Sequence, residues 1–188
     1  MRILPCQPEP RPHVSSELRW FGSARFCEGS GMQPADELSR DFTVATFVVF
    51  DGKILLLWHR KLQKWLPPGG HIDSNELPDE AAVREVREEA GLDIELVGES
   101  GVPVRSPRQL IRPAGVQLEA IRPGHEHIDL IYFARPTDPN RIATTRNAES
   151  EAVGWFGPDE LAALGVVPDV RLWADRAILA VEGKKRPI

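Results

Sequence analysis

The apolar residues of the chain predict strands at its beginning and in its second half. Residues Phe42–Phe50 are almost all β-branched or aromatic, which is typical of a buried strand. The Asp51-Gly52 pair that follows is a strong signal for a two-residue hairpin turn, so we expect Lys53–His59 to return as a second strand. Later strands are expected over residues 93–99, 118–121, 128–134 and 152–156.

Three further segments have the composition or spacing of helices, and each begins with a proline. Proline suits the first position of a helix, and glycine suits the left-handed residue just beyond its end. In the last segment, apolar residues recur every three or four positions, which predicts a stripe that faces a core. The segments are Pro78–Ala90, Pro158–Leu164 and Pro168–Glu182, and the stripe consists of Val170, Trp173, Ala177 and Val181.

The N-terminal segment differs in composition from the rest of the chain. Residues 1–31 are rich in Pro, Ser, Gly, Arg and Glu and contain only scattered apolar residues, so we expect little order there. Met32 opens the first domain-like stretch, and we hypothesise that it is the true start of translation. The expected organisation is an extension over residues 1–36 and one domain over residues 37–188.

The segment Pro78–Ala90 also carries the most informative polar pattern. Its apolar residues predict one face toward a core, and Glu85, Glu88 and Glu89 occupy positions i, i+3 and i+4 on a neighbouring face. The apolar face consists of Ala82, Val83, Val86 and Ala90. A charged helix of this kind is often only a solvated surface. Three carboxylates directed at one point nevertheless suggest a hard cation such as Mg²⁺ or Mn²⁺.

These glutamates belong to a longer pattern. It runs from Gly70 through Glu76 to Arg84-Glu85-Val86-Arg87-Glu88-Glu89-Ala90-Gly91-Leu92. In its order and spacing it resembles the Nudix box of the Nudix hydrolase superfamily, with every signature position filled. The resemblance implies an α+β fold, an α/β/α sandwich around a central mixed β-sheet. It also implies a metal-dependent hydrolase that cleaves a phosphoanhydride bond in a nucleoside diphosphate linked to another moiety.

The resemblance assigns roles within the box. A Mg²⁺ or Mn²⁺ ion would be held by the Gly70 carbonyl and by Glu85, Glu88 and Glu89. The catalytic residues would be Glu88, Glu85, Arg84 and Glu76, with Arg84 holding the carboxylates in place. Members differ in their general base. Glu149 or Glu151, which precede a Trp-Phe strand in an expected loop, could therefore supply the base or a further metal ligand.

Candidates for substrate binding follow the box. Arg105 and Arg108 lie in a proline-rich loop, and arginine is a natural partner for phosphate oxygens. His125 and Glu126 stand where the strand over residues 128–134 is entered, which we expect to lie at the rim of the active site. His125-Glu126-His127 also suggests a zinc site, but we disfavour zinc because no cysteine or further histidine is nearby in the sequence.

Composition and charge limit the range of partners. The 188 residues are 41% hydrophobic and 27% charged, which suits one domain with a tail. The net charge of -5 argues against binding to nucleic acid through phosphate contacts. Both cysteines precede the expected domain and no stretch has the length of a membrane span. We therefore expect a cytoplasmic protein that acts on a small nucleotide-type diphosphate, without nucleic acid or membrane partners, and a homodimer stays open.

Two other functions share this fold. A nucleotide-binding sensor without turnover would usually lack the box carboxylates, which this chain retains. An isomerase of a prenyl diphosphate would need a catalytic cysteine inside the domain, and Cys6 and Cys27 lie before it.

Trp65 is interpreted as a core residue, with base stacking as the alternative. The identity of the diphosphate substrate cannot be predicted from these residues.

Overall fold

The computed structural model describes residues 38–138, 140, 143 and 150–183. Contacts within the chain separate residues 1–35 from residues 36–188. The expectations for the N-terminal extension, for a start at Met32 and for the two cysteines lie outside the described residues and stay predictions.

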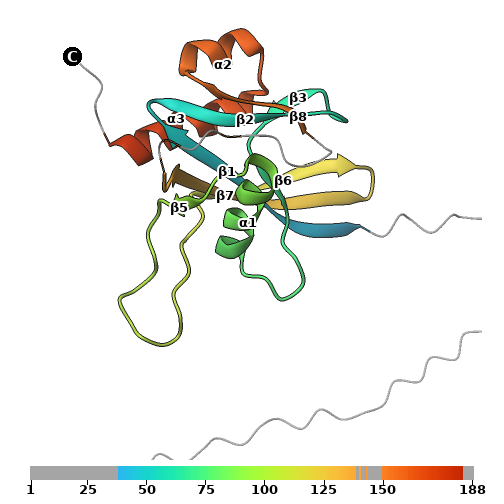
Figure 1. Ribbon diagram of the computed structural model, residues 1–188. Coiled ribbons are helices and arrows are strands. Elements are labelled where there is room, and N and C mark those ends of the chain that lie inside the picture. Colours follow the sequence, from blue (N-terminus) through green and yellow to red (C-terminus); the bar gives the residue numbers. More distant parts are fainter. Residues whose placement is uncertain (1–37, 139, 141–142, 144–149, 184–188) are drawn as a thin grey trace, which may run out of the picture. The chain divides into compact units, whose positions relative to one another are not determined.

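The described residues form eight strands and three helices (Figure 1). The strands pair in the order β3-β2-β1-β7-β5, while β4 pairs with β1, β6 with β7 and β8 with β2. The pairing of β1 with β7 is parallel and the others are antiparallel, so the sheet is mixed. The strands are β1 (Ser39–Phe50), β2 (Lys53–His59), β3 (Lys64–Leu66), β4 (Gly69–His71), β5 (Ile94–Leu96), β6 (Gly115–Arg122), β7 (His125–Pro136) and β8 (Ser150–Phe156).

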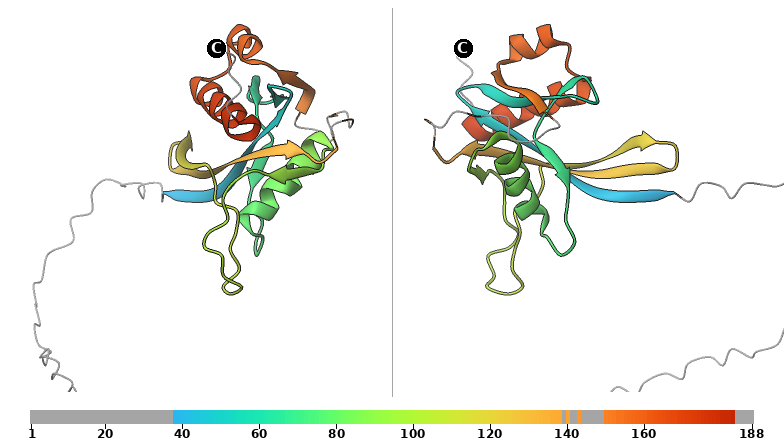
Figure 2. Two further views of the ribbon diagram at one scale, coloured as in Figure 1. Left: turned by 90° about the vertical axis from the view of Figure 1, so that its left-hand side faces the viewer. Right: turned by 45° about the vertical axis from the view of Figure 1, so that its right-hand side comes forward.

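Helices cover both faces of the sheet, as the two further views show (Figure 2). The helices are α1 (Pro78–Ala90), α2 (Pro158–Leu164) and α3 (Pro168–Glu182). Alternate residues of β1 face opposite sides, as the two-residue repeat of a strand requires. Phe47 and Val49 pack in one buried cluster with residues of α2 and α3, whereas Val48 packs in another with residues of α1. The predicted sandwich around a mixed sheet is confirmed.

The local predictions for the first hairpin and for the helices are confirmed. Asp51 and Gly52 have φ values of 49° and 69°, so both central residues of the turn are left-handed, as this tight hairpin demands. All three helices have the predicted bounds. Gly91 ends α1 in the left-handed conformation, and its N–H donates to the Arg87 carbonyl. Leu77, as expected for a poor N-cap, provides no side-chain hydrogen bond.

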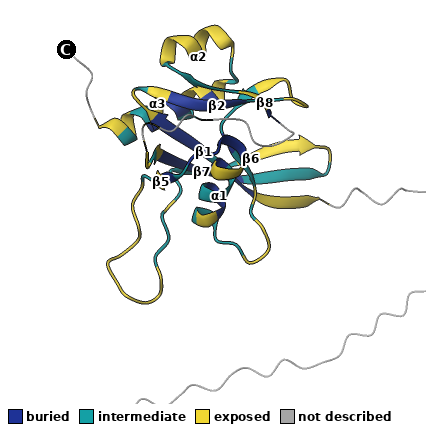
Figure 3. Cartoon of the chain, viewed as in Figure 1, coloured by how far each residue is buried: buried dark blue, intermediate teal, exposed yellow. Residues whose placement is uncertain are grey.

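The buried faces of α1 and α3 overlap the predicted stripes (Figure 3), although Val83, Trp173 and Val181 are only partly buried. Ala82, Val86 and Ala90 of α1 are fully buried, and Val170 and Ala177 of α3 are buried. The buried side of α1 also includes a carboxylate. Glu89 is only 8% exposed, although the helical pattern placed it with two other glutamates on a polar face.

Two sequence-based placements around later strands are wrong. His125 and Glu126 belong to β7 itself rather than to its entry, because β7 extends three residues further toward the N-terminus than its apolar run. Glu151 lies on β8 and not in a loop, because β8 pairs with β2 as far as Ser150 opposite His59. The apolar run alone gave too short a strand in both places.

The tryptophans of the domain pack against other aromatic rings. The Trp65 ring centroid lies 4.8 Å from that of Phe156 and 5.6 Å from that of Trp58, in edge-on arrangements. Trp65 packs against the cluster beneath α2 and α3, which supports its interpretation as a core residue. Trp173 packs edge-on against Phe133, and its indole N–H donates to Gln117 Oε1 at 2.8 Å. No helix in the described ranges is both long and apolar enough to cross a membrane.

Candidate active site

The entry to the box is held close to the sheet by two glycines. Gly69 and Gly70 lie on β4, opposite Ala45 and Val44 of β1. A Cβ atom on Gly69 would overlap the Val44 carbonyl oxygen, and one on Gly70 would lie 2.5 Å from Glu85 Oε1. A larger residue at position 69 would therefore separate β4 from β1, whereas one at position 70 would displace the Glu85 carboxylate.

Arg84 joins the loop of the box to its helix. Its Nε and Nη2 donate to the two carboxylate oxygens of Glu76 at 2.7 and 2.9 Å, which is the bidentate geometry that arginine favours. Its Nη1 donates to Glu85 at 2.8 Å and to Glu88 at 3.2 Å. Nη2 also donates to the His71 carbonyl at 3.0 Å. One guanidinium therefore aligns three carboxylates and the end of β4.

The arginine affects the acidity of its neighbours in different ways. Hydrogen bonds from Arg84 lower the pKa of Glu76 below its ordinary value of 4.5. The pKa of Glu85 is raised, because the cost of burying its charge outweighs the hydrogen bond and the attraction from Arg84. The pKa of Arg84 itself is raised mainly by its hydrogen bond to Glu76. Glu85 is thus a carboxylate whose surroundings leave its negative charge incompletely compensated.

The three predicted metal-binding glutamates have distinct surroundings on α1. Glu89 is buried and accepts a hydrogen bond from the Gly69 N–H at 3.0 Å. The Glu85 side chain is 13% exposed and lies against Gly70, whereas that of Glu88 is 58% exposed. Their carboxylates do not form a set within 4.8 Å of one another. Glu85 and Glu88 each accept a hydrogen bond from Arg84, so these two carboxylates lie beside the same guanidinium group. The three carboxylates do not converge as closely as the helical pattern suggested.

The predicted substrate-binding residues lie in two different neighbourhoods. Arg108 contacts α1, where it donates to Glu80 at 3.2 Å, and Arg105 is exposed in the same loop. His125 and Glu126 lie on β7 beside the first residues of β1. His125 Nδ1 is 2.9 Å from Ser39 Oγ, and Arg40 Nε donates to Glu126 at 2.8 Å.

The two candidates for a further base are not brought to the box by any described contact. Glu151 is exposed on β8 and pairs with Arg60 Nε at 2.8 Å. Glu149 lies outside the described residues. The roles considered for both residues stay predictions.

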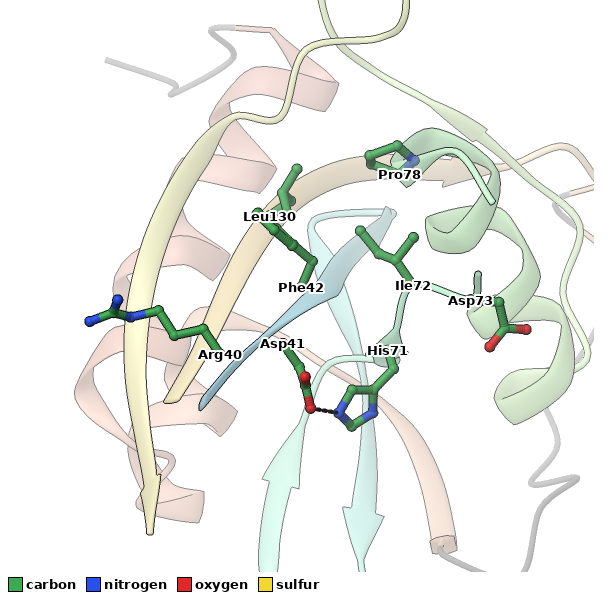
Figure 4. Close-up of a pocket in the computed structure, with 8 residues that line it drawn as sticks. All are labelled: Arg40, Asp41, Phe42, His71, Ile72, Asp73, Pro78 and Leu130. Atoms are coloured by element: carbon green, nitrogen blue, oxygen red, sulfur yellow. Dashed lines mark ion pairs between the residues drawn. The ribbon is translucent and has the colours of Figure 1, made fainter. Parts of the chain in front are cut away.

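A cleft of about 680 Å³ opens beside the box (Figure 4). It has an apolar wall formed by Phe42, Ile72, Pro78 and Leu130, and a polar edge where Asp41 points toward His71. Arg40 and Asp73 complete its lining. A second cleft of about 590 Å³ is lined by nine residues, namely Glu76, Asp79, Glu80, Val83, Arg84, Arg87, Glu95, Leu96 and Ile111.

The sequence reasoning missed Asp41 and His71, which the fold brings to the edge of the first cleft. Asp41 stands one residue before the strand predicted over Phe42–Phe50, and His71 directly follows Gly70 of the box. The order of residues offers no sign that they meet. Their Nε2 and Oδ2 atoms lie 3.5 Å apart because β4 pairs with β1.

Comparison with known families decides the relationship. The NUDIX domain family matches residues 40–177 of the chain. The chain belongs to the Nudix hydrolase family. Its fold resembles that of a Nudix hydrolase from Clostridium perfringens, with 35% identity, a TM-score of 0.65, and coverage of 75% of this chain and 97% of the other. A MutT protein from Methanosarcina mazei shares the Nudix fold at 19% identity, with a TM-score of 0.57 over 79% of this chain and 99% of the other.

Curated Nudix relatives differ in their named substrates. The m7GpppN-mRNA hydrolase NUDT17 of Xenopus laevis is 32% identical over 117 residues, which are 50% of this chain and 40% of that protein. The putative 8-oxo-dGTP diphosphatase 3 of Mycobacterium tuberculosis is also 32% identical, over 60% of this chain and 46% of the other. The chain thus spans less than half the length of these two relatives.

Proposed function

We propose that this Nudix protein is a metal-dependent hydrolase that cleaves a phosphoanhydride bond in a nucleoside diphosphate linked to another moiety. The main support is the network in which Arg84 holds Glu76, Glu85, Glu88 and the end of β4 together, in the middle of a complete box. A surface helix would not need a bidentate arginine with its partners largely shielded from water. The Glu76 and Glu85 side chains are 15% and 13% exposed.

Nudix hydrolases generally use divalent metal ions, and the donor atoms of the box suit Mg²⁺ or Mn²⁺. The proposed ligands are the Gly70 carbonyl and the carboxylates of Glu85, Glu88 and Glu89, all of them hard oxygen donors. The raised pKa of Glu85 is consistent with a carboxylate that lacks part of its counter-charge. When bound, such an ion neutralises diphosphate charge and increases the acidity of a water molecule.

The protein's own groups would position and deprotonate the attacking water. The exposure of Glu88 supports it as the base, since a proton acceptor must reach water and the substrate. Glu85 is the alternative on the same helix, while Glu149 and Glu151 stay predictions. Arg84 and Glu76 would act by fixing the direction of these carboxylates, which is a positioning role.

The substrate would be a small nucleotide-type diphosphate. The proposed contacts are Arg108, which bonds to Glu80 of α1, Arg105 in the same loop, and His125 and Glu126 on β7. Some relatives are named for mRNA caps or for RNA, so diphosphates attached to RNA belong among the substrates to be tested. The cytoplasmic location, the absence of nucleic-acid partners and the homodimer stay predictions.

A turnover screen tests the proposal. Release of phosphate, pyrophosphate or nucleoside monophosphate is measured with Mg²⁺ or Mn²⁺ for dNTPs, 8-oxo-dGTP, nucleotide sugars, ADP-ribose, dinucleotides and RNA with a cap or 5′-triphosphate. We expect metal-dependent release from at least one substrate, and a loss of about a hundredfold or more in Glu88→Gln. The matched control is Glu160→Gln, because Glu160 is an exposed glutamate on α2, on the opposite face of the sheet from α1. Absence of release from every substrate, or equal turnover by Glu88→Gln, would contradict the proposal.

A further inference from the structure

A second group of metal-type ligands lies outside the carboxylates of the box. The parallel pairing of β1 with β7 sets Asp41 opposite His127 and Ser39 opposite His125. Residues two apart on a strand face the same side of a sheet, so His125 and His127 are neighbours on one face of β7. Ligand atoms of Asp41, His125 and His127 all lie within 4.8 Å of one another.

The distances in this group are those of ligands around one ion. The Nε2 atoms of His125 and His127 are 3.2 Å apart, and His125 Nε2 is 3.7 Å from Asp41 Oδ2. Zinc binds imidazole nitrogen and carboxylate oxygen at about 2.0–2.1 Å in a tetrahedron, which sets its ligand atoms about 3.3 Å apart. The ordinary alternative is a hydrogen bond between the two rings with Asp41 in ion pairs to the imidazoles, and only metal binding would need all three ligand atoms at these distances at once.

A neighbouring side chain orients one of the two histidine rings, as is usual for a histidine that binds a metal. Ser39 Oγ lies 2.9 Å from His125 Nδ1, so the far nitrogen of that ring is held while Nε2 faces the other ligands. The His125 side chain is 14% exposed, while Asp41 is 50% exposed and leaves a path for an ion.

His71 adds a third imidazole at the edge of the group. Its Nε2 lies 3.5 Å from Asp41 Oδ2, and its ring centroid lies 4.9 Å from that of His127. It also lines the first cleft, where Figure 4 shows it meeting Asp41. The fourth coordination position would therefore face this ring and the cleft.

We propose that Asp41, His125 and His127 form a binding site for Zn²⁺, with the fourth position open toward His71 and the cleft. Nitrogen donors distinguish this site from the oxygen donors of the box, so the two would select different ions. The sequence disfavoured zinc because no further ligand lies near these two histidines along the chain, whereas in the fold Asp41 of β1 lies beside both of them.

The test uses the full chain without a histidine tag, stripped of metal by a chelator and kept in excess Mg²⁺ so that the box is supplied with its own ion. Zn²⁺ is titrated in competition with a chromogenic chelator, and Co²⁺ is added separately to record the strong visible absorption of tetrahedral coordination. We expect one equivalent of Zn²⁺ per chain and a tetrahedral Co²⁺ spectrum. His127→Gln and Asp41→Asn should each weaken Zn²⁺ binding by about a hundredfold.

Two matched controls separate this site from other histidines and from the box. His59→Gln changes a histidine on β2 outside the group, and Glu88→Gln changes the box, so both should bind Zn²⁺ like the unmodified chain. If His127→Gln does not fold, judged by circular dichroism, the near-isosteric Asp41→Asn carries the test. Absence of stoichiometric Zn²⁺ binding, unchanged affinity in a folded His127→Gln or Asp41→Asn, or an equal loss in Glu88→Gln would overturn the proposal.

Discussion

Replacing Arg84 by lysine tests whether the fork of this arginine, and not just its charge, holds the box together. Arg84 donates five hydrogen bonds, two of them to Glu76, one each to Glu85 and Glu88, and one to the His71 carbonyl. Lysine keeps the positive charge but cannot form the planar bidentate pair.

The loss in free energy of unfolding follows from these contacts. The side chain of Arg84 is 25% exposed and that of Glu76 15%, so water replaces the lost bonds only in part. A hydrogen bond to a charged group contributes about 1.5–3 kcal/mol. Lysine would retain one strong hydrogen bond to a carboxylate and would lose a free energy equal to that of one or two such hydrogen bonds. We therefore expect Arg84→Lys to lower the free energy of unfolding by about 2–3 kcal/mol.

The assay is urea unfolding without metal, combined with turnover on whichever substrate the screen finds. Arg87→Lys is the matched control, because Arg87 lies on the same helix and pairs with Asp93 at 2.8 Å but is 61% exposed. An exposed pair contributes little, so the control should change by less than about 0.5 kcal/mol. Turnover of Arg84→Lys should also fall, since Glu85 and Glu88 lose their common support. Equal unfolding free energies for the two variants would refute the argument from geometry.

Three further predictions concern the same box. Glu85→Gln should leave the metal-free protein as stable as the parent chain or more stable, because it removes the charge of a buried carboxyl group whose pKa is raised. The variant should not show the rise in melting temperature that Mg²⁺ gives the parent chain, and an equal rise in both would contradict the metal assignment. Gly69→Ala should destabilise the fold, because its Cβ would meet the Val44 carbonyl, whereas Gly70→Ala should mainly reduce turnover by displacing the Glu85 carboxylate. Thermal melts and turnover rates distinguish the two variants, and a larger loss of stability in Gly70→Ala than in Gly69→Ala would be inconsistent with the packing. Because the pKa of Glu76 is lowered in the folded protein, its ionised form stabilises the fold at pH values above the ordinary pKa of 4.5, and this stabilisation is lost as the pH falls through the folded-state pKa. Glu76→Gln should therefore show a smaller loss of unfolding free energy on acidification than the parent chain.

Much of the box could be predicted from the sequence because its interactions are local. Helix α1 begins at Pro78 and ends before Gly91, as the residue types indicate, and the hairpin turns at Asp51-Gly52. Arg84 lies four residues before Glu88, and this helical spacing alone brings their side chains together. Such contacts depend on backbone preferences and on the helical repeat, both of which are written in short stretches of sequence.

Contacts between distant strands were decided only by the tertiary structure. Asp41 meets His125 and His127 because β1 and β7 pair in parallel, and a shift of one residue in that register would turn these side chains to the opposite face. Glu89 is buried because β4 crosses near α1 and offers the Gly69 N–H, a partner that the helical pattern does not reveal. The physical reason is that strand register depends on the packing of the whole sheet, whereas helix ends and tight turns depend on their own few residues.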